Sequence, residues 1–165
     1  MANIPFSPPD ITEAEINEVC EALRSGWITT GPRTKEFERR LAEYCGTQKV
    51  ACLNSATAAL ELNLRVLGIG EGDEVIVPAY TYTASASAAI HVGAKVIFID
   101  SKPDSFEMDY DLMEKAINEK TKAIIPVDLA GIICDYDRIY AAAENKKHLF
   151  KPANDIQKAM GRIAV

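Results

Sequence analysis

The sequence has no long hydrophobic run, and this excludes the simplest kind of membrane protein. None of its apolar stretches approaches the roughly 20 residues that a membrane-spanning helix needs. The first residues carry neither a basic segment nor an apolar core, so no secretory signal is predicted. We therefore expect a cytoplasmic protein with no membrane partner. Its 165 residues are the length of one ordinary domain.

Basic residues are also fewer than acidic residues in this sequence. The chain has 18 lysines and arginines against 24 aspartates and glutamates, which gives a formal net charge of −6. Nucleic-acid binding needs a basic surface that neutralises phosphates, so no nucleic acid is expected as a partner. The proportions of apolar (48%) and charged (25%) residues are close to the globular average, which excludes wholesale disorder.

Cysteine and histidine are too few and too widely spaced to predict a metal or redox site. Cys20, Cys45, Cys52 and Cys134 match neither a zinc motif nor a CxxC pair, and we expect them to be reduced thiols. The two histidines have no potential metal ligand at a useful spacing. We therefore expect no metal site.

A glycine-rich phosphate loop is missing as well. The one cluster of glycines, at 68–72, follows a predicted helix and precedes a predicted strand. Dinucleotide-binding and P-loop motifs need the opposite order, with the strand first. An unrelated nucleotide-binding domain is therefore the least favoured of the functions considered.

Strand and helix patterns alternate along the chain. Continuous apolar runs predict strands at 50–53, 74–78, 95–100 and 123–127, with a further strand near 163–165. Helical spacing predicts two amphipathic helices before residue 46, the first starting at a Thr12–Glu15 capping box, and helices at 55–67, 81–91, 110–119 and 136–144. Strands that are apolar throughout are typical of a sheet covered on both faces. The predicted fold class is α/β, with a mostly parallel, doubly wound sheet.

The start of the helix at 55–67 is the first candidate binding segment, because ligands of open α/β sheets bind beyond the carboxyl ends of the strands. Free N–H groups and the positive end of the helix dipole suit an anion there. A hydroxyl at Ser55 or Thr57 adds a donor, and Ala56 lets the backbone approach closely. Ser55 is equally well explained as an ordinary N-cap.

Two further groups follow strands. Tyr80 and Tyr82 come after 74–78, where an aromatic face could stack on a planar ring, although either tyrosine could belong to the core. Asp128 comes after 123–127, where a carboxylate could hold a ligand hydroxyl or amine, or could cap the following turn. Together with the helix start, these groups form one predicted site.

Three segments of the chain resemble a known family. They are WITTGP at 27–32 followed by Phe37-Glu38, NSATAAL at 54–60 with LGIGEGDEVIVP at 67–78, and YTYTAS at 80–85. In combination they resemble the DegT/DnrJ/EryC1/StrS aminotransferases, pyridoxal-phosphate enzymes that mostly aminate nucleotide-linked keto-sugars. The resemblance runs from Ile4 to Val165.

The resemblance implies a cofactor, pyridoxal 5'-phosphate, and residues that hold it. Ala56 and Thr57 would bind the cofactor phosphate through backbone N–H groups and a hydroxyl. Tyr82 would stack on the pyridine ring. The implied fold is the large domain of a fold-type-I aminotransferase.

The resemblance also implies substrates and a partner. Trp27 and Thr29 would lie near the substrate, and Asp128 is a third candidate there, although the family more often has a histidine at that position. The implied substrates are a nucleotide-linked keto-sugar and an amino-group donor, with glutamate expected. The implied partner is a second copy of the chain, in a homodimer whose active sites use both subunits.

The family's aspartate for the pyridine nitrogen and its Schiff-base lysine follow the strand that corresponds to 163–165. None of the eleven lysines here stands in the context of the family's lysine. We therefore expect residues 1–165 to be the N-terminal part of the large cofactor-binding domain, truncated before the catalytic lysine, with no catalytic residue and no activity alone. A non-catalytic binding or regulatory fragment, and a sugar dehydratase of the same family, are the alternatives.

Overall fold

The computed structural model describes residues 4–5 and 7–165, and residues 1–3 and 6 lie outside the description. The chain divides into two compact units, one ending at Cys52 and the other beginning at Leu53, and each is described by itself. Within the described residues, no helix combines the length and the apolar character needed to cross a membrane.

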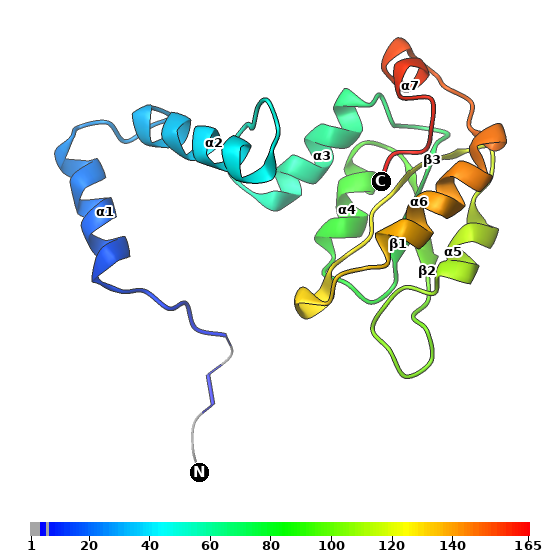
Figure 1. Ribbon diagram of the computed structural model, residues 1–165, viewed down its shortest axis with the longest axis horizontal. Helices are drawn as coiled ribbons and strands as arrows, with labels where there is room; N and C mark the ends of the chain where they lie inside the picture. Colours follow the sequence, from blue (N-terminus) through cyan, green and yellow to red (C-terminus); the bar gives the residue numbers. More distant parts are fainter. Residues whose placement is uncertain (1–3, 6) are drawn as a thin grey trace. The chain divides into compact units, whose positions relative to one another are not determined.

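The first unit contains two amphipathic helices, α1 (Glu13–Arg24) and α2 (Pro32–Cys45) (Figure 1). Thr12 and Glu15 form the capping box that the sequence predicts for α1. The guanidinium of Arg33 joins the helices through ion pairs with Glu18 and Glu21. No residue of either helix is buried, so this unit has no core of its own within these two elements.

The second unit is built on a three-stranded parallel sheet. Its strands are β1 (Glu74–Pro78), β2 (Lys95–Ile99) and β3 (Thr121–Ile124), arranged in the order β2-β1-β3. β1 is central and buried along its whole length, which explains why its sequence is apolar on both faces. Because the strands are parallel, their carboxyl ends lie at the same edge of the sheet.

Helices cover both faces of this sheet, so the predicted doubly wound α/β fold is confirmed (Figure 1). They are α3 (Ala56–Val66), α4 (Ala84–His91), α5 (Tyr110–Ala116) and α6 (Tyr136–Asn145). On one face Val75 and Val77 pack with apolar residues of α3 and α4. On the other face Ile76 packs with residues of α5 and α6.

Tyr110 is the largest fully buried side chain of the described core, with 1% of its surface exposed. Its hydroxyl donates to Glu107 Oε1 over 3.1 Å and accepts from the Asp135 N–H over 2.9 Å. The Nζ of Lys102 lies 4.3 Å from the ring centroid. Tyr110 thereby joins the loop after β2 to the loop before α6. Burial raises the pKa of Tyr110 to about 12.

Two predicted strands are not formed as expected. Residues 50–53 form no strand, and within the described chain no strand pairs with them. At 163–165 only an isolated parallel bridge forms, between Ala164 and Ala123. Ala164 donates to the Lys122 carbonyl over 3.0 Å and accepts from the Ile124 N–H over 2.8 Å.

Sequence patterns also missed one helix and two short turns. Helix α7 (Asp155–Met160) precedes the C-terminal segment, and single 3₁₀ turns occupy Leu129–Gly131 and Lys147–Leu149. Asn154 caps α7 by accepting from the Gln157 N–H over 2.9 Å. The spacing of these two residues is that of a capping pattern, so a signal for α7 was present in the sequence.

Candidate functional site

The carboxyl edge of the sheet carries the candidate residues of the second unit. The segment after β1 contains Tyr80 and Tyr82, and the segment after β3 contains Asp128. Helix α3 also starts at this edge, because it leads through the turn at 68–73 into the amino end of β1 and therefore runs opposite to that strand. The topology thus brings the helix start, the tyrosines and the carboxylate to one edge.

The start of α3 presents hydrogen-bond donors. The Ser55 side chain accepts from the Ala58 N–H over 3.1 Å, and the Ser55 carbonyl accepts from the Ala59 N–H over 3.1 Å. Ser55 is therefore an N-cap. The backbone N–H groups of Ala56 and Thr57 and the Thr57 hydroxyl have no hydrogen-bond partner among the described residues. The cap and the anion site are thus compatible, since they use different groups.

The two tyrosines have different environments. The Tyr80 ring stacks on Phe106, with centroids 5.1 Å apart and an angle of 21° between the planes. The Tyr82 side chain is 79% exposed and stacks on no other ring among the described residues. Neither tyrosine is core, since Tyr80 is also 55% exposed. Tyr82 is the more exposed of the two tyrosines and has no ring stacked on it among the described residues.

Asp128 is committed to the loop that follows β3. Its Oδ1 accepts from the Cys134 N–H over 2.9 Å, and the Tyr136 hydroxyl lies 3.2 Å from both carboxylate oxygens. These bonds, above all the one from Cys134, lower the pKa of the Asp128 carboxyl. The loop includes Ala130 at φ 53° and Gly131 at φ 79°. The Asp128 side chain makes no capping bond to the 3₁₀ turn at Leu129–Gly131; it closes the longer loop by binding Cys134 and Tyr136.

Trp27 and Thr29 belong to the first unit. The Trp27 indole donates to the Thr30 carbonyl over 3.1 Å. Its ring lies directly on Gly31, where a Cβ would be 1.9 Å from the indole nitrogen. Both Trp27 and Thr29 are exposed. Glycine is therefore required at 31 for the indole to occupy this position.

Three lysines near the sheet, Lys95, Lys102 and Lys122, have structural partners. Lys95 starts β2, and its Nζ lies 3.2 Å from Glu74. Lys122 lies at the start of β3 and donates to the Lys151 carbonyl. Lys102, which follows the carboxyl end of β2, lies 3.4 Å from Glu107 and against the Tyr110 ring. Each of these three ammonium groups thus has a partner other than Tyr82.

Contacts of Phe106 and Tyr136 at this edge escaped the sequence patterns. Phe106 lies in a loop with no regular spacing, and Tyr136 begins the predicted helix at 136–144. Neither pattern indicates a contact with Tyr80 or Asp128.

The chain matches known proteins over most of its length. The family model of the DegT/DnrJ/EryC1/StrS aminotransferase family matches residues 9–161. A UDP-4-amino-4-deoxy-L-arabinose–oxoglutarate aminotransferase of Shewanella sediminis is 44% identical over 144 residues, which are 87% of this chain and 37% of that protein. The spore coat polysaccharide biosynthesis protein SpsC of Bacillus subtilis is 42% identical over 142 residues, or 86% of this chain and 36% of that protein.

Solved structures agree. The putative sugar aminotransferase Spr1654 of Streptococcus pneumoniae, in its PMP form, superposes with a TM-score of 0.94 at 66% identity. The match covers 98% of this chain and 41% of that one. The same protein has also been solved in a PLP form. The chain therefore spans well under half the length of the relatives it matches.

Proposed function

Because the chain belongs to the DegT/DnrJ/EryC1/StrS aminotransferase family, whose members use pyridoxal 5'-phosphate, we propose that it supplies the phosphate-binding part of a sugar aminotransferase. The observation that carries the proposal is the start of α3, where two backbone N–H groups and the Thr57 hydroxyl have no partner among the described residues. Such a group of donors at the positive end of a helix suits a phosphate dianion.

The residues present fit the cofactor. Ala56 and Thr57 would hold its phosphate, and the small side chain of Ala56 leaves the backbone accessible. Tyr82, whose side chain is exposed, would lie against its ring. The bound cofactor supplies the electron-withdrawing ring on which amino groups are exchanged. The task of this chain is to bind and orient that ring.

We extend the proposal to the substrates. The name of the Shewanella relative contains a UDP-sugar and oxoglutarate, which supports a nucleotide-linked keto-sugar as amino acceptor and glutamate as amino donor. Trp27 and Thr29 are proposed to contact the substrate. Asp128 is retained as a weaker candidate, because its carboxylate already binds Cys134 and Tyr136. An aminotransferase is favoured over a dehydratase by the relatives at 44% and 66% identity.

We propose further that residues 1–165 form the N-terminal part of a large cofactor-binding domain, and that the protein acts as a homodimer. The covalent lysine is then expected outside these residues, because none of the eleven lysines here stands in the context of the family's lysine. Sedimentation of the full enzyme tests the dimer.

The proposed cofactor site is tested on this chain by titration with pyridoxamine 5'-phosphate. This probe has no aldehyde, so it cannot attach to surface lysines. We expect saturable binding that inorganic phosphate competes away, and at least tenfold weaker binding of pyridoxamine, which lacks the phosphate. Equal binding of the two compounds would overturn the phosphate site.

Replacement of Tyr82 by alanine is expected to weaken pyridoxamine 5'-phosphate binding about two- to tenfold, the usual range for a stacked aromatic pair. Tyr82→Phe should bind as the wild type does, because the ring faces survive. Melting of the unliganded chain should change little in both variants, since the side chain is 79% exposed.

Tyr80→Ala is the matched control, because the Tyr80 ring already stacks on Phe106. Its affinity for the probe should stay close to that of the wild type. A loss in Tyr80→Ala with none in Tyr82→Ala would assign the ring contact to Tyr80 instead.

A further inference from the structure

The end of α3 opposite the proposed phosphate site is held by two amide side chains. The carbonyl of Leu67, which caps α3, accepts from Asn154 Nδ2 over 3.0 Å and from Gln157 Nε2 over 2.8 Å. We call Asn154, Gln157 and the Leu67 carbonyl the amide clamp. Gln157 is 1% exposed, so its hydrogen bonds are shielded from water.

The other polar atoms of both amides are also engaged. Gln157 Oε1 accepts from the Ala153 N–H over 2.9 Å, and Asn154 Oδ1 accepts from the Gln157 N–H over 2.9 Å. These bonds leave each amide only one orientation, with its NH₂ group toward Leu67. The clamp is therefore fixed in direction by α7 itself.

The chain at the end of α3 is shaped to accept the clamp. Gly68 has a φ of +66°, which favours glycine, and a Cβ there would lie 2.2 Å from Asn154 Nδ2. The Ile69 N–H donates to the Leu64 carbonyl over 3.0 Å, which turns the chain away from the helix. The Leu67 carbonyl is thus left free for the two amides.

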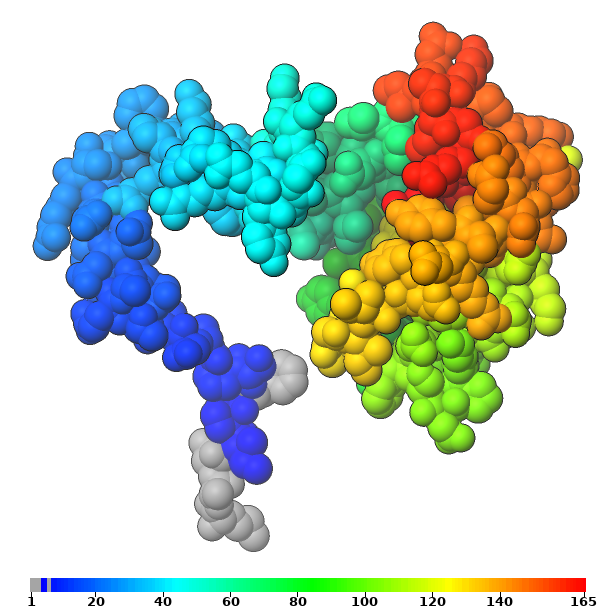
Figure 2. Space-filling model, viewed as in Figure 1, coloured from blue at the N-terminus to red at the C-terminus, as the bar shows by residue number. Residues whose placement is uncertain are grey.

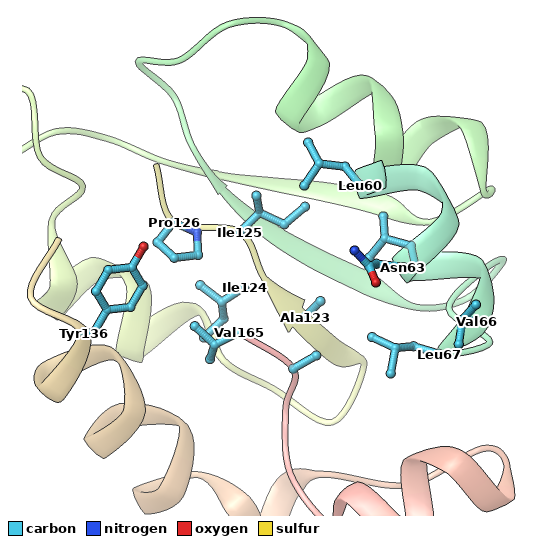
Figure 3. Close-up of a pocket in the computed structure, with 12 residues that line it drawn as sticks. Leu60, Asn63, Val66, Leu67, Ala123, Ile124, Ile125, Pro126, Tyr136 and Val165 are labelled. Carbon is cyan, nitrogen blue, oxygen red and sulfur yellow. The ribbon is translucent and has the colours of Figure 1, made fainter. Parts of the chain in front are cut away.

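Side-chain packing of α3 is incomplete along one flank. A groove of about 500 Å³ separates α3 from the β3 side of the sheet, and α3 contributes Leu60, Asn63 and Val66 to its lining. Figure 3 shows these residues on one side and Ala123 to Pro126 with Val165 on the other. Leu64 is the one buried residue of α3. α3 packs with α4 and β1 on its other side, and the amide clamp adds a directed contact at its C-terminal end.

We propose that the amide clamp positions the phosphate-binding start of α3, and that Asn154 and Gln157 are positioning residues for the cofactor. α7 lies beside the end of α3 (Figure 2). An α-helix of 11 residues is about 16 Å long and stiff along its axis. Fixing the C-terminal end of α3 therefore also fixes the position of its N-terminal start along the helix axis. This inference rests on the proposed function, which places the phosphate at Ala56 and Thr57.

The test uses Asn154→Asp. This variant keeps the oxygen that caps α7 but loses the N–H that binds the Leu67 carbonyl. Asp155→Asn is the matched control. It makes the reverse change one residue away, on a side chain that is 97% exposed and pairs with Lys158. Asn154→Ser, which keeps a capping oxygen without adding charge, serves if Asn154→Asp does not fold.

Two measurements are made on each variant: amide hydrogen exchange at Ala58 and Ala59, in the first turn of α3, and affinity for pyridoxamine 5'-phosphate. We expect Asn154→Asp, and Asn154→Ser in its place, to speed exchange at these amides about fivefold or more and to weaken the affinity by a similar factor. Asp155→Asn should change neither.

The outcomes are distinguishable. Faster exchange confined to 67–69, with Ala58, Ala59 and the affinity unchanged, would make the clamp a local cap and overturn the inference. Absence of binding by the wild type would overturn the proposed function instead. Exchange at Ala58 and Ala59 would still decide whether the clamp positions the start of α3.

Discussion

Thr57→Val is expected to lower the affinity of the chain for pyridoxamine 5'-phosphate about ten- to hundredfold. Valine keeps the shape of threonine but has no hydroxyl, and a hydrogen bond to a charged group contributes about 1.5–3 kcal/mol. The Thr57 hydroxyl has no partner among the described residues, so its loss should cost the fold little. The measurement is a binding titration together with thermal melting of the unliganded chain.

Ser55→Ala gives the opposite pattern and serves as the control. Ser55 caps α3 by accepting from the Ala58 N–H, and loss of such a cap costs about 1 kcal/mol of stability. Melting should therefore drop more in Ser55→Ala than in Thr57→Val, while affinity drops more in Thr57→Val. If Thr57→Val bound the probe with wild-type affinity, the segment at 55–57 would be an ordinary helix start with no role in phosphate binding.

Tyr110→Ala is expected to destabilise the second unit by about 3–5 kcal/mol, because it empties the space of a fully buried aromatic ring. Tyr110→Phe should cost about 1–3 kcal/mol, since it keeps the ring but leaves the Asp135 N–H and Glu107 without their partner. Urea unfolding followed by circular dichroism measures both. Tyr44→Ala, at an exposed site on α2, should be neutral.

The pH dependence of stability provides a second signature of Tyr110. Its pKa is raised from 10.0 to about 12 in the folded state, so the folded protein holds this proton more tightly than the unfolded chain. The resulting stabilisation is fully present below pH 10 and is lost as the pH rises through about 12; it amounts to about 3 kcal/mol. The stability gap between wild type and Tyr110→Phe should therefore narrow above pH 10. A constant gap would contradict the raised pKa.

The central strand was the easiest element to predict. Val75, Ile76 and Val77 are apolar without interruption because helices bury both faces of β1, and its predicted bounds match the structure. β3 starts two residues earlier and ends three residues earlier than the predicted 123–127. Its first residues, Thr121 and Lys122, are polar but buried, and hydrogen bonds to the Asn118 N–H and the Lys151 carbonyl satisfy them.

A strand depends on its partner as well as on its own residues. Residues 50–53 have the apolar composition of a strand, yet they pair with no described strand. In contrast, Ala164 pairs with Ala123 of β3 in an isolated parallel β-bridge. Pairing over such distances in sequence is not encoded in either segment alone.

The candidate site was predictable where a topological rule applies. Thr57 and Tyr82 were placed at the carboxyl edge because helix starts and strand ends meet there in parallel sheets. The rule cannot choose between neighbours. The stacking of Phe106 on Tyr80 and the hydrogen bond from Tyr136 to Asp128 depend on how the loops pack. The hydrogen bond from Gln157 to Leu67 joins residues that are 90 positions apart in the sequence.

The indole on Gly31 gives the first unit its own optical signal. Trp27 is the single tryptophan of the chain, so tryptophan emission originates in the unit that ends at Cys52. Far-ultraviolet dichroism, in contrast, records helices of both units. Coincident transitions of the two signals would mean cooperative melting, and separated transitions would mean independent melting. A single native fluorophore thus distinguishes the two units without any label.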